Sequence, residues 1–308
     1  MIFRPYRAAD AMAVSQLFRL VYGDRYVQPD VYLPKLITQH NLDGRWQSML
    51  AVEGSQILGH AALCRDKLPT DSFELALSVV HPVARGQNIA TRLGRELLEC
   101  AGSLSAQYVL IKQVTHHPFT QRMAQTLDFH CTGLLPDHVP SPYGALLAES
   151  IVIGVHPING RSWPLPDIAW PESCRGFMEH LSKMFGTGSD VSACAPRLLN
   201  MTQNHQRIDV VIERLDKRLL DQLVQLPEAW LVSAKVALSA NFSEDFERLS
   251  ANRFVFTGLL PAPRQGHWFA LFHRGAHARR LDLNCPHMQR LQDNLPRPRT
   301  VEVGRSAA

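Results

Sequence analysis

The sequence predicts an α/β fold in which two related domains each contain a mixed sheet. Three observations support this prediction: the order of the expected strands and helices, a proline-rich break near the middle of the chain, and a short internal repeat. The chain has 308 residues, more than one hydrophobic core usually supports, so two domains of roughly 150 residues are expected. Hydrophobic residues make up 45% of the chain and charged residues 19%, a composition that excludes disordered and fibrous proteins.

Strands and helices follow a definite order through the first half. We expect strands at 2–5, 48–53, 56–64, 73–80, 108–114, 129–135 and 145–155, and helices at 10–21, 29–37, 88–102 and 119–127. The spacing of Ile89, Leu93 and Leu97, for example, is typical of an amphipathic helix. Because this order combines hairpins with one strand–helix–strand crossover, we expect a mixed sheet with helices on both faces.

A linker is predicted at 156–172, which contains four prolines and little periodicity. It separates a first domain, 1–155, from a second, 173–275. The second domain is expected to contain helices at 174–185, 216–226 and 244–251 and strands at 207–214, 230–238, 254–260 and 268–273. The remaining segment, 276–308, is basic and proline-containing, and we expect it to be a solvated tail.

An internal repeat connects the two domains. The segment FHCTGLLP at 129–136 is echoed by FVFTGLLP at 254–261, each after a strand, a polar linker and a helix. Duplication of one domain explains this pattern, and the alternative is coincidence between two apolar strands. The second copy lacks a counterpart of 82–90, so any chemistry of that segment belongs to the first copy alone.

Several function classes are disfavoured by bulk properties. The net charge of +4 suits an anionic ligand but is too small to predict nucleic-acid binding. Neither a signal peptide nor an apolar run of membrane-spanning length is recognised, so a cytoplasmic protein without membrane contact is expected. The six cysteines are scattered without CxxC spacing, and we predict neither disulfides nor metal.

The segment SVVHPVARGQNIATRL predicts a strand, a turn and the beginning of a helix. Such a junction presents unpaired amides and the positive end of a helix dipole, which together can bind a pyrophosphate. Gly86 lets the backbone approach phosphates, Ala90 keeps the first helical turn uncrowded, and Arg85 and Arg92 can add charge. An ordinary strand–helix turn is the alternative.

The same segment resembles a known signature. V-x-x-P-x-x-R-G-Q-x-I-A-T-R-L is similar to the coenzyme A motif, R/Q-x-x-G-x-G/A, of the Gcn5-related N-acetyltransferase (GNAT) superfamily. Further similar segments are Arg4-Pro5 with Ala9-Asp10, Gly59-His60-Ala61, Glu74-Leu75 and Leu127-Asp128-Phe129. The chain resembles a bacterial two-domain subgroup, closely over 1–155 and loosely over 165–275, whose C-terminal GNAT-like domain is degenerate.

Three positions depart from the family pattern. Asn88 replaces the central glycine of the loop, and Asn is among the few residues that tolerate unusual backbone angles. Asp128 replaces the glycine of the family's L-G-F segment. Ala124 stands where many members carry the tyrosine that acts as general acid.

The resemblance implies a tandem acyl-CoA N-acyltransferase fold and direct transfer of an acyl group, most simply acetyl from acetyl-CoA, to an amine of a small molecule. The strand before the loop would splay from its neighbour and pair with the pantetheine arm. The implied cofactor-binding residues are Leu77, Ser78, Val79, Val80, Arg85, Gly86, Gln87, Asn88, Ile89, Ala90 and Thr91.

Candidate catalytic residues lie on the strands beside this loop. Glu74 stands where many members keep a catalytic glutamate and is our candidate base; the alternative is a surface strand residue. His116 and His117 follow the next strand and can replace the missing acid or fill a turn. His60 is expected to be structural. Three tyrosines predict an aromatic wall for the acceptor or, equally, plain packing: Tyr22, Tyr26 and Tyr32.

Two other functions remain open at this point. A non-catalytic acyl-CoA-binding regulator is favoured by Asn88, Asp128 and Ala124. For an acyltransferase with an acyl-carrier-protein donor, weaker binding of the pyrophosphate would matter less. Acetylation of a protein lysine, a monomeric or homodimeric state, and a role of the second domain in substrate binding or docking are also undecided by the sequence.

Overall fold

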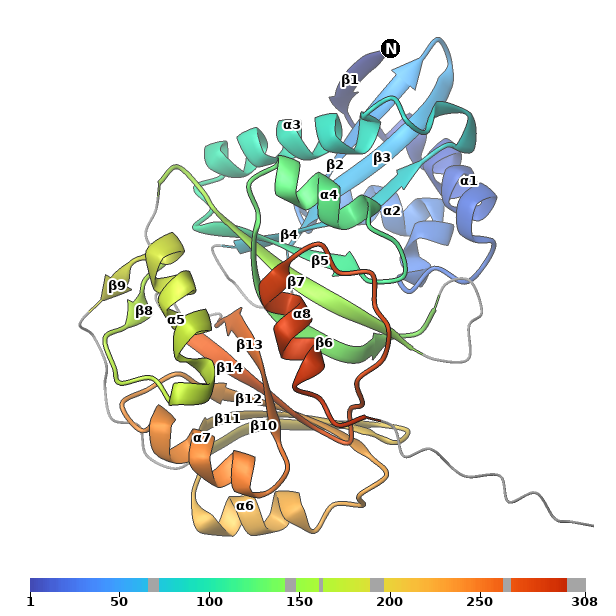
Figure 1. Ribbon diagram of the computed structural model, residues 1–308. Coiled ribbons are helices and arrows are strands. Elements are labelled where there is room, and N and C mark those ends of the chain that lie inside the picture. Colours follow the sequence, from blue (N-terminus) through green and yellow to red (C-terminus); the bar gives the residue numbers. More distant parts are fainter. Residues whose placement is uncertain (66–71, 142–147, 161–162, 189–196, 263–266, 298–308) are drawn as a thin grey trace, which may run out of the picture.

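The computed structural model describes residues 1–65, 72–141, 148–160, 163–188, 197–262 and 267–297 (Figure 1). Twelve strands form one sheet in the order β1-β2-β3-β4-β5-β7-β6-β13-β14-β12-β11-β10. Their bounds are Ile2–Pro5 (β1), Trp46–Glu53 (β2), Gln56–Cys64 (β3), Ser72–Val80 (β4), Tyr108–Val114 (β5), His130–Val139 (β6), Glu149–Pro157 (β7), Arg197–Asn204 (β10), Arg207–Arg214 (β11), Leu231–Ala237 (β12), Val255–Pro261 (β13) and Trp268–Arg274 (β14). A separate pair joins Leu165–Pro166 (β8) to Thr187–Gly188 (β9).

The helices cover both faces of this sheet, as the sequence predicts. They are Ala11–Tyr22 (α1), Pro34–Leu42 (α2), Ile89–Ser103 (α3), Phe119–Thr126 (α4), Glu172–Phe185 (α5), Lys217–Val224 (α6), Phe242–Ala251 (α7) and Pro286–Asp293 (α8). In the first half, residues 2–157, the core of α1 and α2 includes Leu77 and Val79. The core of α3 and α4 instead includes Phe73 and Leu75, so one strand, β4, supports helices on both faces.

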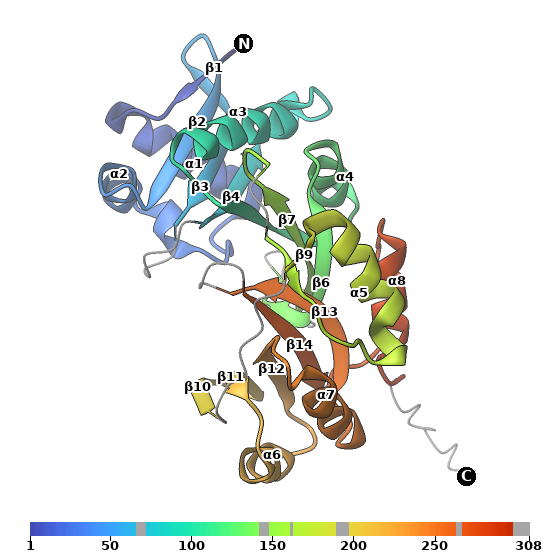
Figure 2. The same cartoon turned by 90° about the vertical axis from the view of Figure 1, so that its left-hand side faces the viewer.

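The mixed α/β class predicted from the sequence is confirmed, and the element order of the first half follows the prediction. The second half of the sheet, residues 197–274, repeats the strand order of the first. The five strands β3-β4-β5-β7-β6 correspond to β10-β11-β12-β14-β13, and the pairs β4–β5 and β11–β12 are both parallel. The two halves meet where Gly133 of β6 pairs with Gly258 of β13, within the repeated TGLLP segments. Figure 2 shows one half above the other, joined through β6 and β13.

Two connections differ in length between the halves. In the first half, residues 81–88 separate β4 from α3. In the second half only Leu215 and Asp216 separate β11 from α6, and the Asp216 carboxylate caps the helix by accepting from the Leu219 amide (2.7 Å). The second half therefore lacks the loop, as the repeat comparison predicts.

Three regions differ from the sequence prediction. The helix expected at 29–37 is a 3₁₀ turn, Pro29–Tyr32, followed by α2, because Pro34 restarts the helix at its first position. The sequence predicts no element between 185 and 207, but the structure has β10 there. The strand expected at 145–155 begins at Glu149, with 142–147 outside the described residues. Part of the predicted linker, 163–166, is buried through Trp163 and Leu165.

The segment 276–297 is not a solvated tail. Its helix α8 buries Met288 and Leu291 in the same core as β6 and β13. Arg279 pairs with Asp137 (2.6 Å) and donates to the Ala148 carbonyl oxygen. The prediction failed because basic residues and prolines hide the short apolar stripe of α8. Residues 298–308 lie outside the described part of the chain.

The glycine pair between the halves predicts a sharp sensitivity to side chains. Gly258 has φ +113°, and a Cβ there would lie 2.5 Å from both the Gly133 Cα and the Thr132 carbonyl oxygen. We expect Gly258→Ala to lower the free energy of unfolding by about 2–4 kcal/mol, measured by chemical denaturation. Gly176→Ala on the exposed face of α5, where a Cβ meets nothing within 4 Å, is the control and should not destabilise. Equal stability of the two variants would contradict the close approach of the strands.

Candidate functional site

The candidate site begins where β4 and β5 separate. Their parallel pairing runs from Ser72 beside Tyr108 to Leu75 beside Ile111, and no pair follows in the described residues. Beyond this point β4 pairs with β3 and β5 pairs with β7. The His81 amide donates to the Leu58 carbonyl oxygen of β3 (2.9 Å), so the Val80 amide, one residue before it, points towards the separated side. An extended ligand can pair with a strand edge of this kind.

A β-bulge produces this separation. Leu77 has φ +53°, and two residues of β4 oppose one residue of β3 between the pairs His60–Val79 and Ala62–Ala76. His60 is fully buried beneath the bulge, where its Nδ1–H donates to the Leu77 carbonyl oxygen (2.8 Å). Its Nε2 accepts from the Ser48 hydroxyl (3.1 Å). Burial lowers the pKa of His60 to about 4, so the ring is neutral and structural.

The loop after β4 turns the chain into α3 through two left-handed residues. Gly86 has φ +81° and Asn88, the residue that caps α3, has φ 57° and ψ 21°. The first helical bond is donated by the Arg92 amide to the Asn88 carbonyl oxygen (3.0 Å). Within the described part of the chain, no residue accepts from the amides of 86–91. They form a concentration of donors at the positive end of a helix dipole.

Both departures from the family's glycines keep the glycine-like backbone. Asn88 and Asp128 each adopt φ 57°, which Asn and Asp reach at lower cost than other side chains. The Asn88 side chain makes no capping hydrogen bond. Ala124 is buried in the core of α3 and α4 and offers no proton donor. Arg92 stacks on Phe3 (4.0 Å to the ring centroid), which fixes one of the two predicted loop arginines.

The three tyrosines predicted to line an acceptor site do lie together. The rings of Tyr22 and Tyr26 are 4.8 Å apart, and the Tyr26 amide donates to the Tyr32 hydroxyl (2.8 Å). Burial raises the pKa of Tyr26 well above its usual value, and the charge of Glu74 contributes to the rise. Glu74 therefore lies within electrostatic range of the tyrosine cluster. It accepts a hydrogen bond from the Lys112 ammonium of β5 (2.7 Å).

The two histidines lie elsewhere. Glu74 is beside Leu110 on β5, and β5 continues to Val114, about 13 Å further along the strand, before His116 follows. His116 Nδ1 is 2.8 Å from Glu149 Oε2, and the His116 and His117 rings are 4.2 Å apart. Burial lowers the pKa of His117. The structure thus groups Glu74 with the tyrosines and leaves the histidines at the far end of β5.

A second charged group, not predicted from the sequence, lies in the second half. Arg207 forms a two-pronged ion pair with Asp209 (2.7 and 2.8 Å) on β11. It also donates to the Asp137 carbonyl oxygen (3.0 Å) and to His138 Nδ1 (3.1 Å) of β6. Burial lowers the pKa of both His138 and Lys235, and the charge of Lys112 lowers both further, so this group lies within electrostatic range of the Glu74 pair. A lysine inside an apolar strand, as in YVLIKQV and LVSAKVA, is the sequence signal that could have indicated it.

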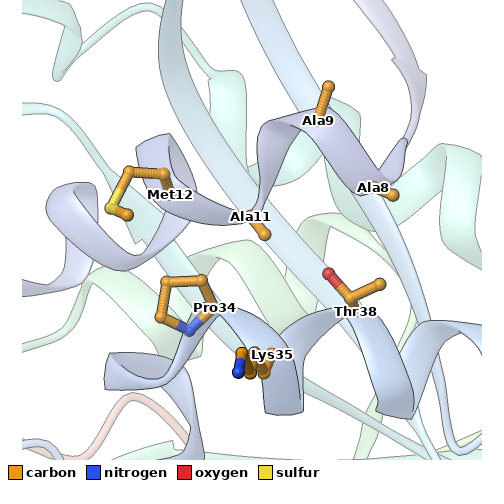
Figure 3. Close-up of a pocket in the computed structure, with 7 residues that line it drawn as sticks. All are labelled: Ala8, Ala9, Ala11, Met12, Pro34, Lys35 and Thr38. Carbon is orange, nitrogen blue, oxygen red and sulfur yellow. The ribbon is translucent and has the colours of Figure 1, made fainter.

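Figure 3 shows a different hollow, between the start of α1 and α2. It is lined by Ala8, Ala9, Ala11, Met12, Pro34, Lys35 and Thr38. None of these is a predicted site residue, and the lining offers a single charged group. The described residues include no cluster of metal-ligating side chains. Over the same ranges, no helix has the length and apolar character needed to span a membrane.

Comparisons with known proteins give structural matches only. No protein-family model and no curated protein matches the chain. A ribosomal-protein-alanine N-acetyltransferase from Brucella melitensis is 18% identical, with 51% of this chain and 100% of that chain covered and a TM-score of 0.44. The corresponding values for an N-acetyltransferase from Staphylococcus aureus Mu50 are 14%, 51%, 97% and 0.45. Those for a GNAT phosphinothricin acetyltransferase from Sinorhizobium meliloti, in complex with AcCoA, are 17%, 51%, 88% and 0.44.

The activities named for those proteins are not assigned to this chain by these matches. The features of the site come from the geometry of this chain alone. The order β1-α1-α2-β2-β3-β4-α3-β5-α4-β6-β7 is the one that the sequence pattern predicts, and the split of β4 from β5 is the one that the resemblance implies. In this first half the split, the amide-rich loop and Glu74 all belong to one strand or its immediate continuation.

The buried imidazole beneath the bulge predicts a specific pH dependence of stability. The unfolded state binds a proton on His60 near pH 6.5, and the folded state only near pH 4. Stability is therefore lost as pH falls through this window, by roughly 3 kcal/mol from this group. We expect His60→Phe to be less stable than wild type at pH 7, with a difference that narrows towards pH 4. Denaturant titrations at both pH values measure it, and parallel pH profiles would be inconsistent with a neutral His60.

Proposed function

We propose that this chain is an acyl-CoA-dependent N-acyltransferase that moves an acyl group, in the simplest case acetyl, onto the amine of a small molecule. One observation carries the proposal: β4 leaves β5 at Leu75 and leads directly into the amide-rich start of α3. A thioester with a long, extended amide-containing arm and a diphosphate matches this combination of a strand edge and an anion site.

The residues around the split suit coenzyme A as the donor substrate. The amides of 86–91 would bind the diphosphate, and Gly86 and Asn88 give the backbone the curvature that points these amides to one place. The free edge at 77–80 would pair with the pantetheine amides. Arg85 is exposed beside the loop and adds positive charge. Thioester chemistry comes with the donor, and the chain supplies position, polarisation and proton transfer.

Glu74 is proposed to receive the proton that the acceptor must lose. The neutral amine nitrogen attacks the thioester carbonyl carbon, the C–N bond forms, and the C–S bond breaks as the electron pair leaves with sulfur. The first proton, released by the ammonium, passes to Glu74 directly or through water, and the second N–H proton, lost as the amide forms, is taken up by the thiolate. Tyr26 stays protonated because its pKa is raised, so its phenol is a candidate relay for that second proton, giving one proton to sulfur and regaining one from nitrogen. Ala124 makes no such contribution.

The decisive experiment is calorimetry of the purified chain with acetyl-CoA and with coenzyme A, followed by an assay of thiol release over a panel of amines. Binding with amine-dependent thiol release supports the proposal. Binding without turnover for any amine would favour a regulatory acyl-CoA-binding protein, which the buried Ala124 makes a definite second candidate. If the chain transfers the acyl group from an acyl-carrier protein but not from acetyl-CoA, the donor is the carrier protein and not coenzyme A.

The backbone angle of Asn88 predicts a graded response at the loop. Asn88→Ile forces a β-branched residue into the left-handed region at about 1–2 kcal/mol, so we expect about tenfold weaker coenzyme A binding by calorimetry. Asn88→Gly, which adopts the same angle freely, should bind at least as tightly as wild type. If both variants bind like wild type, the loop is not the diphosphate site.

The role of Glu74 predicts a separation of binding from rate. Glu74→Gln should lower kcat by about 10²–10⁴-fold, because the amide cannot accept the ammonium proton, and leave coenzyme A affinity within twofold of wild type. Glu96→Gln on the exposed face of α3 is the matched control and should change neither quantity. An unchanged kcat in Glu74→Gln would exclude this carboxylate as the base.

A further inference from the structure

The two halves carry equivalent charged pairs on equivalent strands. In the first, Glu74 of β4 lies beside Leu110 of β5, and Lys112 follows two residues later. In the second, Asp209 of β11 lies beside Ser233 of β12, and Lys235 follows two residues later. The repeat therefore places an acidic residue and a lysine at the same register positions in both halves. Side chains two residues apart on a strand share a face of the sheet.

Curvature of the sheet brings the two pairs towards each other. Arg207 of β11 bonds to Asp137 and His138 of β6, although β13, β14 and β12 lie between β6 and β11 in the sheet. Such a bond requires the sheet to bend around the face that carries these side chains. The charges of Lys112, Arg207 and Asp209 all act on the pKa of Lys235, which places Lys235 inside the same bend.

The pairs are nevertheless not equivalent in their bonding. Lys112 is bonded to Glu74 at 2.7 Å. In the second half, Arg207 occupies the register position of Ser72 and takes both carboxylate oxygens of Asp209. Lys235 forms no ion pair or hydrogen bond with any residue that the structure describes. Burial lowers its pKa, as expected for an ammonium group removed from water without a bonded partner.

Among the residues that the structure describes, the charges in this bend do not balance. Lys112, Arg207 and Lys235 are positive and Glu74 and Asp209 are negative, which leaves one positive charge. The neighbouring Asp137 is paired with Arg279, so this pair does not alter the sum. His138 adds none, because burial and the neighbouring cations lower its pKa to about 3. One surplus charge matches a single carboxylate, whereas a phosphate monoester carries nearly two. The Lys235 ammonium is half-buried, and the nearby Asp209 carboxylate is bonded to Arg207 and not to Lys235. An ammonium partly removed from water without a bonded counter-charge is costly, and an anionic ligand relieves that cost.

We infer that Lys235 binds the carboxylate of the acceptor, so that the second half selects amines that also carry a carboxylate, such as amino acids. The amine of such a molecule would face Glu74 and the tyrosine cluster of the first half, with its carboxylate held across the bend. This inference rests on the proposed function for the amine end, and on the charge arrangement of the second half for the carboxylate end.

The test uses the full chain and pairs of ligands that differ in one group. The twenty standard amino acids are compared with their decarboxylated amines and with phosphoethanolamine. Binding is followed by thermal shift in the presence of coenzyme A, and turnover by thiol release from acetyl-CoA. The variants are Lys235→Gln, Lys235→Arg and, as a control of equal charge change, Lys217→Gln on the exposed face of α6.

We expect wild type to bind at least one amino acid about 10–100-fold more tightly than its decarboxylated amine, in line with a charge-assisted hydrogen bond. Lys235→Gln should lose this preference and keep its affinity for coenzyme A, while Lys235→Arg and Lys217→Gln should retain it. Circular dichroism and coenzyme A binding check that the variants are folded.

Three results would overturn the inference: a preference for phosphoethanolamine over every amino acid, a carboxylate preference that survives in Lys235→Gln, or no carboxylate preference in wild type. The proposed function fails separately. If wild type does not bind coenzyme A but binds amino acids in a Lys235-dependent way, the proposed acyltransferase function is wrong and the inferred carboxylate site stands. If wild type binds coenzyme A but no ligand depends on Lys235, the carboxylate site is wrong and the proposed function stands.

Discussion

The site depends on the bulge at Leu77. Without it, β4 would continue beside β5 and bury its edge in ordinary sheet hydrogen bonds. The bulge adds one residue to β4 and so reverses which side chains point to each face of the sheet. Phe73 and Leu75 therefore face α3, while Leu77 and Val79 face α1. His60 donates a hydrogen bond to the displaced Leu77 carbonyl oxygen. The ring is neutral there, because burial disfavours its charged form. One neutral imidazole thus maintains both the two-sided core and the exposed strand edge.

The junction of Gly133 and Gly258 is the second constraint, since it makes two sheets into one. Both residues lie at bulges, between Cys131 and Gly133 in β6 and between Phe256 and Gly258 in β13. Bulges increase local bending, and the absence of side chains lets the backbones approach. The resulting curvature brings Arg207 to His138. The two charged pairs meet only because of this junction.

Much of the first half could be predicted because its signals are local. The loop lies within eight consecutive residues, and Asn88 was expected to tolerate an unusual backbone angle, whereas the left-handed angle of Asp128 was not predicted. The repeat was visible in the sequence as TGLLP. That its two copies pair with each other through Gly133 and Gly258 was not visible, because a contact between two single residues leaves no periodic pattern. The strand β10 and the helix α8 were missed because polar residues interrupt their apolar positions. The segment LVSAKVA marks Lys235 as unusual, but its place near Asp209 depends on the register of β11 and β12.

Comparison of the halves shows how one strand order can carry two different arrangements of charge. Shortening the connection after β11 to two residues removes the amide-rich loop, and Asp216 caps α6 directly, so no anion is needed there. A substitution at one register position, Arg207 where the first half has Ser72, then transfers the Asp209 carboxylate from lysine to arginine. In the second half the start of α6 is therefore occupied by Asp216 and offers no anion site. The proposed anion site lies instead on the face of the sheet that carries Asp209 and Lys235. The second half therefore differs from the first at the loop, and it keeps an acidic residue and a lysine at equivalent register positions.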